Sequence, residues 1–234
     1  NNDSGGTILR GYKEFQANDA NNAKQELIDI LLNLPMPNQG NQYHESQPKE
    51  LHYEWFSYIN GGAIIYGDQT SNNFNGTNLP SPDPSVFSGG VYNSPFTANP
   101  ANFECANFYE VYITSGNETG TDSDLSPQIT TDMSSSAASS FENMVGYMSN
   151  SDMLTQTSGV QSLKSWYIQI GNSAAKADDW AIAAGTHSEY MVISGNANDL
   201  VDIQLTLRNA FKEATNTSAT FVSSSIPTNV FNRA

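Results

Sequence analysis

The sequence predicts an α/β domain with a mostly parallel sheet flanked by helices. From residue 20 onward, segments with helical spacing of apolar residues alternate with short apolar strands. This alternation is typical of parallel strands joined by crossover helices. The 234 residues include 11% aromatics, enough for a hydrophobic core, and the length suits one large or two small domains.

Apolar residues that recur every three or four positions predict the helices. The second of them is expected to start at Ser46, because a serine hydroxyl caps free N–H groups, and Pro48 suits a first turn. The last helix is expected to pack its apolar face, Leu200, Ile203, Leu207, Ala210 and Phe211, on the sheet. The predicted helices span residues 23–34, 46–60, 138–148, 177–184 and 198–211.

Strands are predicted at 108–113, 163–170 and 190–193, with further short strands at 7–9 and 220–222. Segment 67–104 is rich in Asn, Gly, Pro and Ser. We expect it to be a long loop that is mobile or that orders against a partner. The domain is predicted to span residues 1–214, followed by a Thr- and Ser-rich extension or linker at 215–234.

The charge of the chain excludes two classes of partner. There are 24 acidic and 9 basic residues, for a net charge of −15, which opposes binding to nucleic acid and to anionic lipid. The sequence has no apolar run of about 18 residues, so no membrane span is predicted. It opens without a charged-then-apolar leader, so we expect a processed chain or a fragment. Its polarity comes largely from uncharged residues, a composition that favours a secreted or surface protein.

No motif in the sequence indicates catalysis or a cofactor. It lacks a nucleophile elbow, a phosphate-binding loop and a dinucleotide fingerprint. The histidines, His44, His52 and His187, do not have metal-ligand spacing and are expected at the surface. The lone cysteine, Cys105, is expected to be either a buried free thiol or half of a disulfide to another chain.

Several segments, read in order, resemble the PilC/PilY family of tip-associated adhesin and biogenesis proteins of type IV pili. Residues 46–62 resemble the family's "TPL…EA…Y(F/Y)..G" segment, and 92–96 followed by 105–119 resemble "Y.SPI…CQ.N.IILLTDGEPT". Residues 166–171, WYIQIG, resemble "TYTIGF". Residues 183–190 with 198–200 resemble "A..GGG.Y…L", and 226–233 resemble "V.VN.FNR". The order and spacing match over most of the chain.

The resemblance implies a von Willebrand factor A-like fold. Such domains often hold Mg²⁺ or Mn²⁺ with a D-x-S-x-S loop, a Thr and an Asp. This chain has no D-x-S-x-S, while Ser46 stands at the Thr position and Ser115 at the Asp position. A hard cation held by hydroxyls alone lacks anionic ligands. We therefore expect a degenerate metal site that holds no tight metal.

The resemblance also begins after the strand that lies mid-sheet in A-type domains. We expect the domain to be incomplete on its own, with that strand absent from this sequence or supplied by another chain. A sheet closed by segments 1–19 or 220–222 is the alternative.

The resemblance implies a non-enzymatic, extracellular adhesion or assembly domain of a type IV pilus or similar surface filament. Its partners would be other pilus or filament proteins and a host or surface receptor. The alternative is a structural subunit of an extracellular filament or sheath, without receptor binding.

Overall fold

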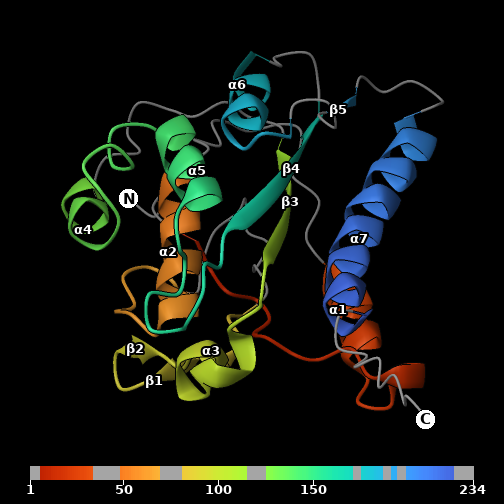
Figure 1. Ribbon diagram of the computed structural model, residues 1–234, viewed down its shortest axis with the longest axis horizontal. Coiled ribbons are helices and arrows are strands. Elements are labelled where there is room, and N and C mark those ends of the chain that lie inside the picture. The colour runs from red at the N-terminus through yellow and green to blue at the C-terminus, as the bar shows by residue number, and fades with distance from the viewer. Residues whose placement is uncertain are drawn as a thin grey trace, which may run out of the picture.

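The computed structural model describes residues 6–33, 48–68, 81–114, 125–170, 175–186, 191–193 and 199–223. These residues form a mixed α/β fold with a small parallel sheet (Figure 1). The helices are α1 (Ala23–Leu32), α2 (Pro48–Asn60), α3 (Pro95–Ala98), α4 (Ser126–Asp132), α5 (Phe141–Asn150), α6 (Ala175–Ala183) and α7 (Asp199–Ser223). The strands are β1 (Phe87–Ser88), β2 (Val91–Tyr92), β3 (Phe108–Thr114), β4 (Leu163–Ile170) and β5 (Met191–Ile193), with short 3₁₀ turns at Ala17–Asp19, Pro84–Val86 and Pro100–Phe103.

The predicted parallel sheet is confirmed over three strands in the order β3-β4-β5. Residues 108–114 of β3 pair without interruption with residues 163–169 of β4, and both strand pairs are parallel. Helices α4 and α5 connect β3 to β4, and α6 connects β4 to β5. The main predicted helices and strands are therefore present, with ends shifted by a few residues, except that α7 continues from the predicted end at 211 to Ser223.

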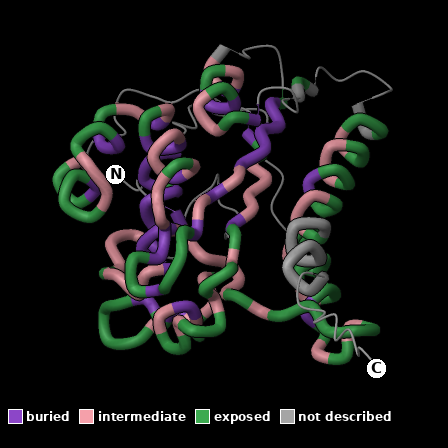
Figure 2. Tube along the Cα trace, viewed as in Figure 1, coloured by how far each residue is buried: buried purple, intermediate pink, exposed green. Residues whose placement is uncertain are grey.

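Helices α2, α5 and α6 cover one face of the sheet. Tyr112 of β3 and Tyr167 of β4 point to this face and contact Trp180 of α6, with ring centroids 5.9 and 6.1 Å away. Phe141 of α5 lies 4.9 Å from the same Trp180 ring. Phe141, Tyr167 and Trp180 are all fully buried. Figure 2 shows the buried residues concentrated in α2, α5 and β4.

Helix α7 lies on the opposite face, where it contacts β3 and β5. Lys164 of β4 points to this face and pairs with Glu213 of α7, with Nζ and Oε1 2.5 Å apart. Most of residues 201–215 of α7 are exposed (Figure 2). This face is therefore only partly covered by the described residues.

The predicted packing of α7 is wrong in one position. Ala210 is buried and Ile203 and Leu207 are half-buried, but Phe211 is 63% exposed. A helix turns about 100° per residue, so the residue after Ala210 lies off the buried line. The side chain of Leu200 lies outside the described residues.

Segment 67–104 is not one long loop. Residues 81–104 form the β1–β2 hairpin, α3 and two 3₁₀ turns, and Val86, Tyr92 and Phe96 are buried in the core. The Ser94 hydroxyl caps α3 by accepting from Phe96 N–H, and it donates to the carbonyl of Ile59 in α2. Residues 69–80 lie outside the described residues.

Two other expectations about segments are wrong. Residues 7–9 form no strand. The boundary at 214 falls inside α7, which continues through 220–222 to Ser223, so the expected strand there is helical.

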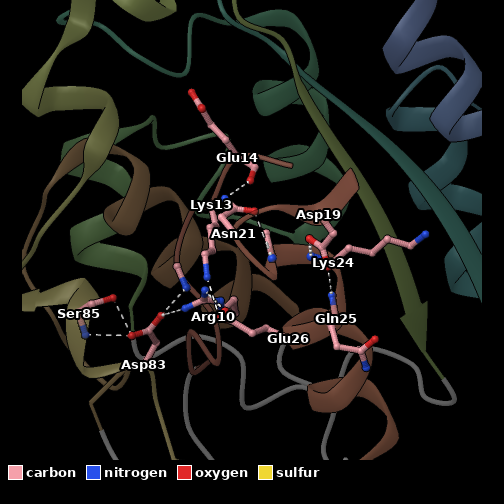
Figure 3. A network of polar contacts seen from close by, with 12 residues as sticks. Arg10, Lys13, Glu14, Asp19, Asn21, Lys24, Gln25, Glu26, Asp83 and Ser85 are labelled. Atoms are coloured by element: carbon pink, nitrogen blue, oxygen red, sulfur yellow. Dashed lines mark hydrogen bonds and ion pairs between the residues drawn. The ribbon is translucent and has the colours of Figure 1, made fainter. Parts of the chain in front are cut away.

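A polar network holds the N-terminal segment against the rest of the domain (Figure 3). The carboxylate of Asp83 accepts from Arg10 Nη1 at 3.2 Å, from the Gly11 N–H at 3.0 Å and from the Ser85 N–H at 2.9 Å. Arg10 also pairs with Glu26 of α1. Burial raises the pKa of Asp83, but these hydrogen bonds and the Arg10 charge outweigh it and lower the pKa to about 2.

Phe211→Ala is expected to change the free energy of unfolding by less than about 1 kcal/mol, because the ring is mostly exposed. Phe141→Ala, the matched buried control, should cost about 3–5 kcal/mol. Urea denaturation of both variants measures these values. A large loss for Phe211→Ala would show that α7 packs with a different face inward.

Asp83→Asn should destabilise the protein at neutral pH and have little effect near pH 2. The folded pKa of Asp83, about 2, lies below the unfolded value of about 3.9. The contribution of the carboxylate is therefore complete above pH 4 and is lost as the pH falls toward 2. Thermal melts of both proteins from pH 7 to pH 2 measure the difference, and a difference that did not change with pH would contradict the prediction.

Candidate functional site

The carboxyl ends of β3 and β4 and the start of α2 meet at one side of the domain. Helix α2 runs antiparallel to β3. The ring centroid of Trp55 lies 5.6 Å from that of Phe108 at the start of the strand. The ring centroid of His52 lies 5.1 Å from that of Tyr112 near the end of the strand. The first residues of α2 therefore lie toward the end of β3. Crevices at the carboxyl ends of parallel strands commonly form binding sites.

The two residues that the sequence assigned to a degenerate metal site, Ser46 and Ser115, lie outside the described residues. Ser46 is two residues before the start of α2, and Ser115 directly follows the end of β3. The start of α2 and the end of β3 lie on the same side of the domain. In the part of the chain that the structure describes, no group of three or more His, Cys, Asp or Glu side chains could hold a metal ion. The expectation about metal binding stays a prediction.

A charged cluster, His52, Glu110 and Ser165, lies between α2 and the sheet. His52 Nε2 is 2.7 Å from Glu110 Oε1, and the Ser165 hydroxyl donates to Glu110 Oε2 at 2.7 Å. His52 Nδ1 is 2.7 Å from the carbonyl oxygen of Pro48. Both ring nitrogens thus lie close to oxygen acceptors, and the His52–Glu110 contact is an ion pair when the imidazole carries both protons.

The environment of Glu110 shifts its pKa in two opposing ways. Burial raises the pKa of Glu110, but the His52 charge and the hydrogen bonds of His52 and Ser165 outweigh burial and hold the pKa below its usual value. Burial and the nearby Glu110 charge raise the pKa of Tyr167 well above its usual value. Glu110 is therefore ionised and Tyr167 neutral at physiological pH.

This cluster does not form an activated nucleophile. The Ser165 hydroxyl donates to the carboxylate, whereas a serine nucleophile needs its proton accepted by the imidazole. His52 is only 1% exposed and Ser165 is fully buried, so substrate has no access to them. The cluster holds α2 against the sheet.

Sequence reasoning placed His52 at the surface, which is wrong. Its ring lies against Glu110 of β3, 58 positions along the chain, and Glu110 in turn accepts from Ser165 of β4. One feature of the sequence could have indicated a buried partner for His52: Glu110 is an acidic residue within an otherwise apolar and aromatic strand. A carboxylate in such a strand needs a buried partner.

Further polar side chains are buried near the end of β4. Gln169 is fully buried, and neither its amide nitrogen nor its oxygen has a hydrogen-bond partner among the described residues. The Tyr167 hydroxyl and Trp180 Nε1, also fully buried, likewise have none there. Lys49 and Glu50 at the start of α2 are buried as well. The carboxyl end of the sheet is therefore polar inside the fold.

Cys105 lies between the last 3₁₀ turn and β3 and is a free, exposed thiol. The expectation of a buried thiol is wrong, because the turn points this side chain to solvent. A disulfide to another chain stays a prediction.

No protein family, curated protein or solved structure matches this chain. None of the helices in the described ranges is long and apolar enough to cross a membrane.

Glu110→Gln should destabilise the protein by about 3–5 kcal/mol if the pair is ionic, because it removes the carboxylate that faces the buried His52 ring and the Ser165 hydroxyl. Glu104→Gln is the matched control, because Glu104 is exposed, and it should cost less than about 0.5 kcal/mol. Urea denaturation at neutral pH measures both. A loss below 1 kcal/mol for Glu110→Gln would show that the pair is not ionic.

Proposed function

We propose that this chain is a non-enzymatic, extracellular adhesion or assembly domain of a type IV pilus or a similar surface filament, with a von Willebrand factor A-like fold. The order of sequence segments that resemble the PilC/PilY family supports the setting. The parallel β3-β4-β5 sheet, with helices on both faces, is compatible with the fold.

The observation that carries the proposal is the exposed apolar face of α1. Leu27, Ile28, Leu31 and Leu32 are 37%, 37%, 58% and 78% exposed. Spacings of three and four residues place them on one side of the helix. Monomeric soluble proteins seldom expose contiguous apolar surface of this kind, and where they do it commonly marks a protein–protein contact.

The charge of the chain fits a protein partner. A net charge of −15 opposes contact with phosphate backbones and anionic lipid. The partners proposed are other pilus or filament proteins, with a host or surface receptor as the target of adhesion.

The chain should co-sediment with purified type IV pili, and Leu31→Glu should raise the dissociation constant about tenfold, since one lost apolar anchor costs about 1.4 kcal/mol or more. Gln25→Glu is the matched control: it adds the same charge to an exposed position of α1 and should leave binding unchanged. Quantified pellets measure both.

No pelleting of the wild-type chain would contradict the proposal. Electron microscopy of the purified chain addresses the alternative role. Filaments formed by the chain alone would identify a structural subunit, because such a subunit makes a repeating self-contact.

A further inference from the structure

Two buried side chains between β4 and α6 carry polar atoms without a partner. Gln169, near the end of β4, is fully buried, and neither its amide nitrogen nor its amide oxygen is hydrogen-bonded within the part of the chain that the structure describes. Trp180 of α6 is also fully buried, and its Nε1–H donates to no acceptor there. Buried polar groups in folded proteins are nearly always bonded to protein or to water, because an unpaired one costs its full desolvation.

Both side chains point into the layer between the sheet and α6. Tyr167 contacts the Trp180 ring, with ring centroids 6.1 Å apart, so Tyr167 points toward α6. Because side chains alternate along a strand, Gln169 lies on the same face as Tyr167, about 6.6 Å further along β4. On the helix, Ala177, Trp180 and Ala181 are fully buried. Their spacing places them on one side of α6, which therefore faces the sheet.

The first turns of α6 lie toward Gln169. Helix α6 connects β4 to the parallel strand β5, so it runs antiparallel to both, and Figure 1 shows it beside the end of β4. Residues of α6 before Trp180 therefore lie toward the end of β4. Ala177, one turn before Trp180, is about 4.5 Å away along the helix axis. Its methyl side chain occupies little space and makes no hydrogen bond.

The chemistry of the unpaired groups indicates a neutral ligand. The Gln169 amide nitrogen and Trp180 Nε1 donate, whereas the Gln169 oxygen accepts, so a matching molecule must both accept and donate. Both oxygens of Glu110, a carboxylate on the same face of the sheet, already have partners within the fold, which disfavours a cation. Burial and the Glu110 charge raise the pKa of Tyr167, and the same charge opposes an anion.

The packing restricts the ligand to a very small molecule. Phe141, Tyr167 and Trp180 are fully buried, and the ring centroids of Phe141 and Trp180 are 4.9 Å apart. Interiors packed in this way contain few voids larger than a water molecule. Water both donates and accepts, and a buried water typically bonds to about three otherwise unpaired polar groups.

We infer that the layer between β4 and α6 contains a structural water site formed by the Gln169 amide and Trp180 Nε1. One or more waters there accept from Gln169 Nε2 and from Trp180 Nε1 and donate to Gln169 Oε1. They link α6 to β4, the strand between β3 and β5. The site involves neither α1 nor a filament contact, so it does not depend on the proposed function.

The test is water-selective NMR on the folded chain. The side-chain amide protons of Gln169 and the indole proton of Trp180 should show cross-peaks to water, with the sign that is typical of long-lived bound water. Tyr167→Phe is the control for relayed transfer, because it removes a neighbouring hydroxyl whose exchange with solvent can mimic bound water. Both sets of cross-peaks should persist in this variant.

Gln169→Met distinguishes a bound water from a dry, unpaired amide. With water bound, the substitution removes a water ligand and leaves Trp180 Nε1 unpaired. The Tm should then fall by about 2–4 °C, and the Trp180 cross-peak should disappear. Gln161→Met is the matched control. Gln161 is equally buried, its amide donates to the carbonyls of Glu104 and Ser158, and its replacement should lower the Tm by a similar amount.

Three results would overturn the inference. A higher Tm for Gln169→Met, or the absence of a water cross-peak to either side chain, would show a dry amide whose removal relieves its desolvation cost. Cross-peaks that vanish in Tyr167→Phe would show transfer through the hydroxyl. Contacts between Gln169 and carbon-bound protons of another molecule would show an organic ligand in place of water.

Discussion

The pairing of β3 with β4 is the constraint on which most of the described packing depends. Parallel strands direct apolar side chains to both faces, so each face requires cover. On one face, Tyr112 and Tyr167 pack against Phe141 and Trp180, which brings α5 and α6 onto the sheet. On the other face, α7 covers only part of the surface. The covered face therefore belongs to the core of the domain, whereas the partly covered face leaves apolar side chains exposed.

The His52–Glu110 pair adds a polar constraint to an apolar interface. Taking the His52 ring and much of the Glu110 carboxylate out of water costs solvation, which their contact and the hydrogen bonds to Pro48 and Ser165 offset. Because these bonds have narrow geometry, they select one position of α2 along β3. A contact made only of apolar side chains would permit α2 to shift along β3. The start of α2 is thus held in register with β3 by the His52–Glu110 contact.

The apolar surface that these contacts leave uncovered is unusual for a protein that acts alone. The apolar side of α1 and the half-covered sheet face expose apolar side chains that other proteins commonly bury. Both surfaces offer apolar area for a contact with another molecule.

The sequence by itself determined the elements whose apolar residues repeat regularly. Strand β4 and helices α2 and α5 follow from the local spacing of apolar residues. The parallel direction of the strands follows as well, because helices separate the strands along the chain. Tertiary structure decided the rest. The pairing of His52 with Glu110 joins distant segments, Phe211 is exposed by the rotation of α7 relative to the sheet, and residues 81–104 order because Val86, Tyr92 and Phe96 find a core formed by other segments. Each of these depends on contacts between parts of the chain that no local pattern brings together.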